Sequence, residues 1–346
     1  MQPIVTARGL TKRFSRKLDY AEKLANVFGA GLAETTVHAV EDVDLVINQG
    51  EVVGLVGESG CGKSTLGRMV TGLVPPTEGD ISWREGGLDS GAARQRLRLF
   101  SQMIFQDPMS SLNPRKKVAQ IIGEAPLLHG LVTRRDVDAY IVELMGRVGL
   151  DASYRHRYPH QFSGGQRQRI SIARALAVQP KLIVCDESVA SLDVSIQAQI
   201  LNQFLELKEE LGLTYLFISH DLAVVKHISD RVVIMYLGRV VESAGAEEFF
   251  ARPNHPYTIA LLREAPSTER RRQRFHPIEG EIPSPLHPPS GCAFHPRCPH
   301  AFDRCRTERP TLREIAPGHV SACHLNAGHV EARRTETAQI VKREGQ

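Results

Sequence analysis

The chain contains the sequence Gly-Glu-Ser-Gly-Cys-Gly-Lys-Ser-Thr at Gly57–Thr65, directly after the apolar run Val-Val-Gly-Leu-Val at 52–56. Residues 57–64 fit the pattern G-x-x-x-x-G-K-[ST], which requires a buried strand before it and a helix after it. The apolar run predicts that strand, and Leu66–Leu73 predicts the helix. Glycines let the loop curl so that several N–H groups point inward, beside the positive end of the helix dipole. This stretch is therefore predicted to bind a polyphosphate.

Several side chains of this loop have chemistry suited to a nucleotide. Lys63 can reach the β- and γ-phosphates, and the Ser64 hydroxyl can take one position on Mg²⁺. Cys61 is interpreted as a filler of the loop, with a reactive thiol at the helix N-terminus, whose alkylation would block ATP, as the alternative. The predicted nucleotide-binding residues of the loop are Gly57, Glu58, Ser59, Gly60, Cys61, Gly62, Lys63, Ser64 and Thr65.

Composition limits the class of protein. The chain has 346 residues, 42% of them hydrophobic, which predicts about two globular domains of ordinary size. The net charge of +4 is mild, and the basic clusters at 94–98 and 270–274 have no interleaved aromatic residues, which favours a solvated surface over a nucleic-acid interface. No uncharged apolar run approaches the ~18 residues of a membrane span, and the N-terminus shows no signal-peptide core. We expect a cytoplasmic protein that reaches a membrane only through a partner.

A second helix N-terminus suited to an anion begins at Ser163. Ser163 occupies an N-cap position, and Gly164, Gly165 and Gln166 follow it at the start of a helix predicted to run to Val178. The two glycines leave the helix start open to close approach by a ligand. Because Ser163 follows Lys63 by 100 residues, one chain need not close both helix ends on one nucleotide.

Polar side chains follow two further predicted strands. The first strand ends in Asp186, placed to hold Mg²⁺, and Glu187, placed to orient or deprotonate an attacking water. The second, at 214–218, is followed by His220, for which the neighbouring motifs favour a γ-phosphate contact over a structural role. Phe14 ends a predicted edge strand that begins at Ile4. Its ring either provides a flat face on which adenine stacks or packs in the hydrophobic core.

Six motifs resemble, in order, those of an ABC transporter ATPase subunit. They are the Walker A sequence at 57–64, the Q-loop Gln106, the signature Ser163–Gln166, the Walker B pair Asp186–Glu187, the D-loop around Asp193 and the switch His220. The departures are small: Phe162 stands where leucine is usual, Ser188–Val189 replaces Pro-Thr, and Ala190–Ser191 inverts the common order. None of them removes a catalytic group, so the resemblance implies a subunit that hydrolyses ATP.

The resemblance also implies an α/β fold and a domain organisation. We expect a P-loop ABC ATPase over residues 1–250, with a RecA-like core, an antiparallel β subdomain and a helical subdomain at about 107–178. An insertion is predicted at 15–36. In this family ATP is sandwiched between the Walker A sequence of one subunit and the signature helix of another. The resemblance implies that Lys63, Gln106, Glu187 and His220 are catalytic. It implies that Ser64, Gln106 and Asp186 bind Mg²⁺. The further nucleotide-binding residues that it implies are Phe14, Ser163, Gly164, Gly165, Gln166, Asp186 and Asp193.

Four cysteines at residues 292–323 predict a second site. Their spacing is C-x5-C-x6-C-x17-C, and disulfides are rare in the cytoplasm, so the thiols indicate a soft metal or remain unligated. The spacing lacks the C-x2-C pairs of common zinc sites and matches neither the bacterial nor the plant-type iron–sulfur pattern. His295, His300 and His324 could serve as zinc co-ligands. Residues 255–323 also resemble the C-terminal extension of the oligopeptide and dipeptide importer ATPases. In some members of that group the cysteines hold a [4Fe–4S] cluster, which the resemblance assigns to Cys292, Cys298, Cys305 and Cys323.

The resemblance implies the energy-coupling ATPase of a di- or oligopeptide importer, at the cytoplasmic face of the cell (inner) membrane. We expect two membrane permease subunits that bind around Gln106 and Tyr154–His160, a second ATPase subunit, and an extracytoplasmic solute-binding protein that acts indirectly. The alternative is a soluble ABC ATPase acting on nucleic acid or the ribosome. Its usual signs, a long coiled coil or two ATPase units in one chain, do not occur here. Residues 251–326 are expected to form the Cys-rich extension and 327–346 a disordered tail.

Overall fold

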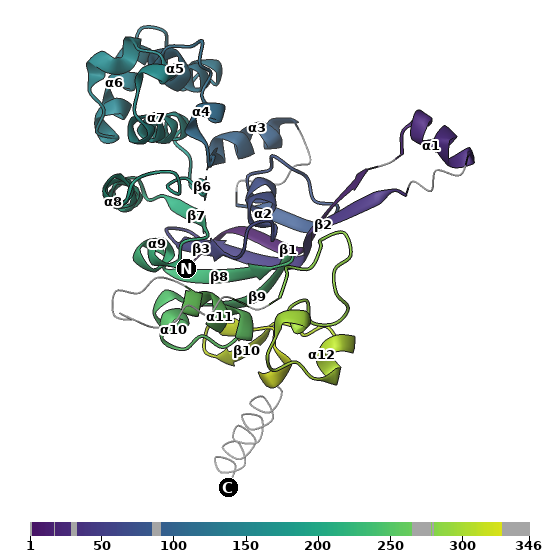
Figure 1. Ribbon diagram of the computed structural model, residues 1–346. Helices are drawn as coiled ribbons and strands as arrows, with labels where there is room; N and C mark the ends of the chain where they lie inside the picture. The colour runs from purple at the N-terminus through teal and green to yellow at the C-terminus, as the bar shows by residue number, and fades with distance from the viewer. Residues whose placement is uncertain are drawn as a thin grey trace.

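The computed structural model describes residues 2–16, 18–28, 33–84, 91–264, 278 and 280–326. Two sheets form the centre of the molecule, and helices cover them (Figure 1). None of the described helices has the length and apolar composition needed to cross a membrane. The tail expected at 327–346 lies outside the described residues.

The strands divide between a three-stranded antiparallel sheet, in the order β2-β1-β4, and an eight-stranded mixed sheet, in the order β10-β11-β9-β8-β3-β7-β6-β5. The strands are β1 (Pro3–Arg16), β2 (Thr35–Asn48), β3 (Val52–Val56), β4 (Glu78–Trp83), β5 (Ser101–Ile104), β6 (Leu182–Asp186), β7 (Thr214–Ser219), β8 (Arg231–Tyr236), β9 (Arg239–Gly245), β10 (Arg313–Ala316) and β11 (His319–Ser321).

Helices fill most of the connections between these strands. The α-helices are α1 (Tyr20–Val27), α2 (Lys63–Val70), α3 (Gly91–Phe100), α4 (Pro108–Ser111), α5 (Val118–Leu128), α6 (Val137–Arg147), α7 (Gly164–Leu176), α8 (Val194–Leu211), α9 (Leu222–Ile228), α10 (Ala246–Ala251), α11 (Pro256–Glu264) and α12 (Asp303–Thr307). The 3₁₀ helices are η1 (Ala152–His156), η2 (Pro159–Gln161), η3 (His295–Arg297) and η4 (His324–Asn326).

Five strands of the larger sheet are parallel, in the order β8-β3-β7-β6-β5, with β5 at the edge of the sheet and the other four inside it. Every residue of β3, β6 and β7 is buried. Because side chains alternate between the two faces of a strand, each face needs a cover. On β7, for example, Leu216 packs toward α2, and Phe217 packs toward the helices of the opposite face. This burial on both faces explains why the sequences of β3, β6 and β7 are almost continuous runs of apolar residues.

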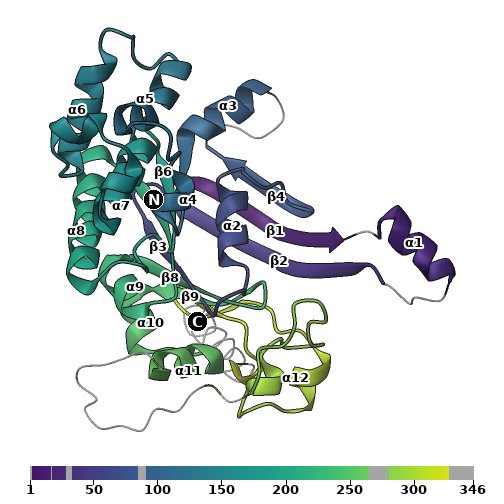
Figure 2. The same ribbon diagram turned by 45° about the horizontal axis from the view of Figure 1, so that its top comes forward.

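Helix α2 lies in the core between the two sheets (Figure 2). Its apolar side chains, such as Leu66 and Met69, share one hydrophobic cluster with residues of both sheets. The Trp83 indole at the end of β4 donates a hydrogen bond to the carbonyl of Val70 (2.7 Å), which attaches the smaller sheet to the end of α2. The opposite face of the larger sheet is covered by α7, α8 and the α5–α6 pair. The phosphate loop is thus fixed at both ends, because the strand before it (β3) and the helix after it (α2) are both packed in the core.

Several sequence predictions differ from the structure. Strand β1 is the middle strand of its sheet, between β2 and β4, and is not an edge strand as predicted from Ile4–Phe14. Helix α2 begins at Lys63, inside the phosphate loop, and not at Leu66. The expected insertion is shorter than 15–36, because β1 and β2 remain paired as far as Arg16 and Thr35. The two strands project from the body and carry α1 at their tip (Figures 1 and 2).

The C-terminal segment is joined to the larger sheet. Strand β11 pairs with β9, and β10 pairs with β11, so that both extend the edge of that sheet. At this junction Glu242 on β9 is completely buried. Its carboxylate accepts hydrogen bonds from the backbone N–H groups of Asn254 and His255 (both 2.8 Å) and from the His319 ring (2.8 Å). One buried carboxylate thus holds three segments of the junction.

Replacing Glu242 with alanine is expected to lower the free energy of unfolding by about 3 kcal/mol, because two backbone donors and an imidazole lose their partner inside the protein. Urea denaturation measures this change. The control is Glu308→Ala, which removes an exposed ion pair with Arg304 and should leave the unfolding midpoint nearly unchanged. Equal effects of the two substitutions would contradict the role of Glu242.

Candidate active site

Four of the predicted site segments lie at one edge of the larger sheet. The phosphate loop follows β3, Asp186 ends β6, His220 follows β7, and Gln106 lies two residues after β5. These four strands are parallel and adjacent in the order β3-β7-β6-β5. Their C-terminal ends therefore bring the four segments together, as in other open parallel sheets.

The phosphate loop is closely packed at Gly57 and Gly62, whereas Gly60 has open space around it. Gly62 has φ 105°, in the left-handed region, and a Cβ at this position would lie 2.1 Å from the carbonyl oxygen of Ala39 on β2. Only glycine fits such a conformation and such an approach. The buried ammonium of Lys63 donates to the carbonyl oxygens of Gly57 (2.7 Å) and Glu58 (3.0 Å), which fixes the curl of the loop.

Ser64 and Asp186 meet across the site. The Ser64 hydroxyl donates a hydrogen bond to the Asp186 carboxylate (2.7 Å). Burial raises the pKa of Asp186, although the Ser64 hydroxyl and the positive charges of Arg68 and Lys63 favour the carboxylate. A hydroxyl and a carboxylate oxygen side by side, next to the phosphate loop, are the type of ligand that Mg²⁺ takes in nucleotide sites. These two residues therefore fit the predicted magnesium position.

The Glu187 carboxylate lies next to the side chains of Gln106 and His220. Its carboxylate accepts a hydrogen bond from the Gln106 amide (2.9 Å) and lies 3.3 Å from Nδ1 of His220. The Glu187 backbone has φ 46°, which is uncommon for a residue other than glycine. Its N–H donates to the carbonyl of Ile218 (3.0 Å) at the end of β7. The structure thus brings Gln106, Glu187 and His220 together, three of the residues that the family resemblance implied to be catalytic.

The signature segment lies apart from the phosphate loop. Ser163 caps α7, and its N–H donates to the Gln166 side chain (3.1 Å), so Gln166 completes a capping box. A Cβ on Gly165 would lie 2.6 Å from the Ile196 side chain, so this glycine also permits α7 to approach α8. No hydrogen bond or ion pair in the described part of the chain joins Ser163–Gln166 to residues 57–65. One chain therefore supplies two separate helix N-termini.

Two other predicted nucleotide-binding residues have local contacts. The Asp193 carboxylate caps α8, accepting from the Ile196 N–H (3.0 Å) and the Ser195 hydroxyl (2.9 Å), and these hydrogen bonds lower its pKa. Phe14 lies on β1 opposite Val37, two residues before Ala39 on β2. Its side chain is 47% exposed, so it is not a core residue, and the Lys12 ammonium lies over its ring.

Cys61 fills the loop, as the first interpretation of its sequence position held, and its surroundings do not favour the alternative of a reactive thiol. The side chain is buried, and burial raises the pKa of its thiol, an effect that the nearby Lys63 charge only partly offsets. A buried, protonated thiol is a poor nucleophile. The helix N-terminus alone was an insufficient indication, because the packing of the loop under the β8–β9 turn was not visible in the sequence.

Sequence reasoning missed two residues that hold the phosphate loop. Tyr257, on α11, accepts a hydrogen bond from the Glu58 N–H (2.9 Å). Arg297, at the end of η3, forms a two-pronged ion pair with the Glu58 carboxylate (2.7 and 3.0 Å). Both lie more than 190 residues from the loop, and no motif in the sequence indicates them.

The four C-terminal cysteines line one small pocket. The same pocket is also lined by histidines: its cysteine and histidine residues are His255, Cys292, His295, Cys298, His300, Cys305, Cys323 and His324. Burial raises the pKa of Cys292, Cys298 and Cys323, in the last case to about 11, and the neighbouring thiols add to the effect. Thiols are soft donors, so the residue types fit a soft metal. Within the described ranges, however, no group of three or more side chains is arranged to hold a metal ion.

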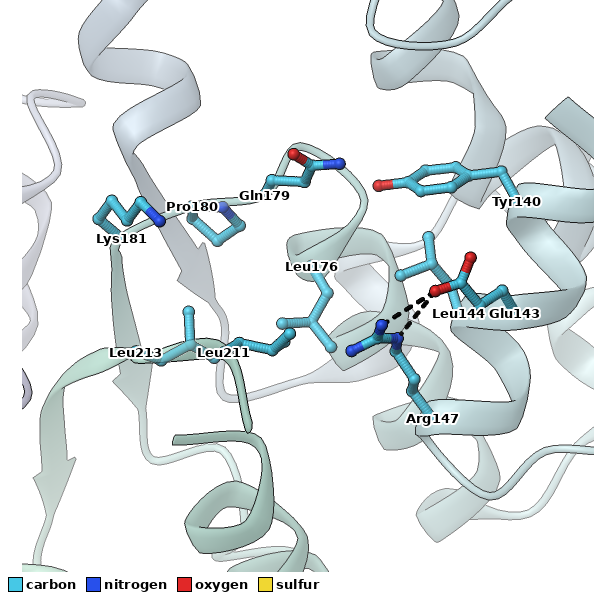
Figure 3. Close-up of a pocket in the computed structure, with 10 residues that line it drawn as sticks. All are labelled: Tyr140, Glu143, Leu144, Arg147, Leu176, Gln179, Pro180, Lys181, Leu211 and Leu213. Atoms are coloured by element: carbon cyan, nitrogen blue, oxygen red, sulfur yellow. Dashed lines mark hydrogen bonds and ion pairs between the residues drawn. The ribbon is translucent and has the colours of Figure 1, made fainter. Parts of the chain in front are cut away.

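A larger pocket lies away from these sites. Figure 3 shows it between α6, the ends of α7 and α8, and the starts of two strands, with Lys181 preceding β6 and Leu213 preceding β7. It is therefore at the edge of the sheet opposite to Asp186. An ion pair between Glu143 and Arg147 lies along one side. This pocket does not belong to the nucleotide site.

Comparisons with known proteins agree with this fold. The ABC transporter family model matches residues 40–190, and the model of the oligopeptide/dipeptide transporter C-terminal region matches residues 241–305. The structure of cbiO1 from Clostridium perfringens, part of an ABC transporter complex, covers 73% of this chain and 92% of its own, with a TM-score of 0.60 and 27% identity. The dimeric MJ0796 cassette, bound to ADP and Pi, covers 70% of this chain and 98% of its own (TM-score 0.59, 26% identity). The fold and the site define a P-loop ATPase of the ABC class.

Closer relatives define the family. The oligopeptide transport ATP-binding protein AppF of Bacillus subtilis is 52% identical over 84% of this chain and 90% of its own length. The probable peptide ABC transporter ATP-binding protein y4tS of Sinorhizobium fredii is 51% identical over 84% of this chain and 83% of its own. The chain belongs to the family of ATP-binding subunits of oligopeptide/dipeptide ABC transporters. These relatives give no support to the alternative of an ATPase acting on nucleic acid or the ribosome.

Proposed function

We propose that this protein hydrolyses ATP to drive the import of di- or oligopeptides through membrane permease subunits. The observation that carries the proposal is the meeting of the phosphate loop, the Ser64–Asp186 pair and the Glu187 carboxylate at one sheet edge. The names of the similar proteins supply the class of cargo. As a peripheral subunit, the protein would lie at the cytoplasmic face of the cell membrane.

Each residue has a role that follows from its position. The loop amides and Lys63 bind the phosphates of ATP, and adenine stacks on the exposed ring of Phe14. Ser64, Asp186 and Gln106 would hold Mg²⁺, which offsets the charge of the phosphates. Glu187 orients a water and accepts its proton as the water attacks the γ-phosphorus in line, and ADP leaves. Gln106 and His220, both beside Glu187, respond to the presence of the γ-phosphate.

Two chains complete the site in this proposal. Ser163 begins a helix that does not contact the phosphate loop of its own chain, so its N-terminus is available to the nucleotide of a partner. Gly164, Gly165, Gln166 and Asp193 accompany it at that interface. The partner is a second ATPase subunit, either another copy of this chain or a similar chain.

The permease surface is proposed around Gln106 and residues 154–160. Tyr158 is exposed, and its ring stacks on His160 with centroids 5.8 Å apart. Two permease subunits bind there, and a solute-binding protein acts through them from outside the cell. We also propose residues 1–250 as the ATPase domain, with the helical subdomain at about 107–178, and 251–326 as the extension.

Replacing Glu187 with Gln is expected to preserve ATP binding and to lower turnover by about 10²–10⁴, because the water loses its base. Cells in which this variant replaces the wild-type chain should not take up a labelled dipeptide or tetrapeptide. The matched control is Glu143→Gln, on α6 and away from the site. Wild-type turnover of Glu187→Gln would contradict its role, whereas normal peptide uptake without the chain would contradict the cargo.

We further propose that Cys292, Cys298, Cys305 and Cys323 hold a [4Fe–4S] cluster, with zinc as the alternative metal. Support comes from the shared pocket and its soft donors. Burial raises the pKa of the Cys292, Cys298 and Cys323 thiols and so favours their protonated form. Binding a metal must therefore release protons and bring the thiolates into ligand positions. When bound, such a centre would act chiefly as a structural clip for the extension.

Protein purified without oxygen is expected to contain iron and sulfide in about equal amounts, near four of each per chain, with a broad visible absorption band. Cys305→Ser should lose most of both. Cys185→Ala, which changes a buried cysteine of β6, should retain them. Zinc alone, or no metal, would contradict the cluster and leave the ATPase proposal intact.

A further inference from the structure

The C-terminal extension reaches the phosphate loop through one buried ion pair. Arg297 donates from Nη1 to Oε2 of Glu58 (2.7 Å) and from Nη2 to Oε1 (3.0 Å). The Arg297 side chain is only 5% exposed and that of Glu58 only 17%. A paired fork of this kind fixes orientation as well as distance, and it is stronger than a neutral hydrogen bond.

The arginine is held by aromatic rings. Its guanidinium lies 6.0 Å from the ring centroids of both Tyr236 and Phe294. Those two rings pack edge to face at 5.2 Å, and Tyr257 packs on each of them at 4.7 and 5.3 Å. All three rings are buried. Arg297 and the Tyr257 hydroxyl are therefore presented to the loop from a closely packed surface with little freedom to move.

Glu58 connects this surface to the residue that meets the phosphates. Its N–H donates to Tyr257, its carboxylate accepts from Arg297, and its carbonyl accepts from the ammonium of Lys63 (3.0 Å). The same carbonyl accepts from the Cys61 N–H (3.3 Å). A shift of the Glu58 backbone would therefore move both Lys63 and the loop amides.

We propose that Arg297 is a positioning residue for ATP binding, acting through Glu58. It holds the loop backbone in the curl that receives the phosphates. It also neutralises the Glu58 carboxylate, which would otherwise repel a triphosphate beside it. This inference deepens the proposed ATPase function and rests on it.

The test compares five variants, four single and one double, with the wild-type chain by equilibrium binding of MgATP, by steady-state ATP hydrolysis and by thermal unfolding. Arg297→Met is expected to weaken MgATP binding about 10-fold or more and to raise KM more than it lowers kcat. Arg297→Lys, which keeps the charge but not the fork, should recover part of the affinity and remains informative if Arg297→Met does not fold. Arg304→Met removes an exposed ion pair of the same extension and should bind MgATP like the wild type.

The decisive comparison is made in a Glu58→Gln background. If Arg297 acts through Glu58, adding Arg297→Met to Glu58→Gln changes MgATP affinity less than about threefold, because the two effects are not additive. An equal loss in both backgrounds would overturn the proposal, as would a lowered unfolding temperature with unchanged affinity. If the wild-type chain itself did not bind MgATP, the ATPase function would fail rather than this inference.

Discussion

The hydrogen bond between Ser64 and Asp186 depends on the order of the parallel strands, and the rest of the site depends on the same order. Because β3, β7, β6 and β5 are adjacent and point the same way, their C-terminal ends place the phosphate loop, His220, Asp186 and Gln106 along one edge. Burial of these strands on both faces makes that order rigid. Chemistry on a phosphate requires such fixed positions, since the protein acts chiefly by placing charge.

The extension is attached to this site as well as to the sheet. Glu242 holds it at β9, and Arg297 and Tyr257 hold the phosphate loop from it. The turn that carries Arg297 is bounded by Cys292 and Cys298, two of the pocket cysteines. The segment that carries Arg297 therefore connects the cysteine pocket with the phosphate loop through the ion pair to Glu58.

Local patterns in the sequence were sufficient to place the phosphate loop, Asp186 and Glu187 directly after buried strands, because each is an apolar run followed at once by its polar residues. The grouping of Gln106, Glu187 and His220 came from the family resemblance, because the direction of the strands was not predicted. The middle position of β1 could not be predicted, since it depends on pairing with β4, about 70 residues further along the chain. The Glu58–Arg297 ion pair could not be predicted from the sequence either. It joins residues 239 positions apart, and it depends on how the C-terminal extension packs against the phosphate loop. The choice between a filler and a reactive thiol at Cys61 could not be made from sequence, because it depends on how deeply packing buries the thiol.

Equilibrium binding of MgATP to the purified chain and to its Lys63→Ala variant tests the central claim most directly, namely that residues 57–65 bind the phosphates of ATP. Loss of the ammonium should weaken binding about 10- to 100-fold, as expected for charge-assisted contacts. Lys116→Ala, which removes an exposed charge on the helical side of the molecule, serves as the control and should bind like the wild type. Equal affinities of the wild-type and Lys63→Ala proteins would contradict the account.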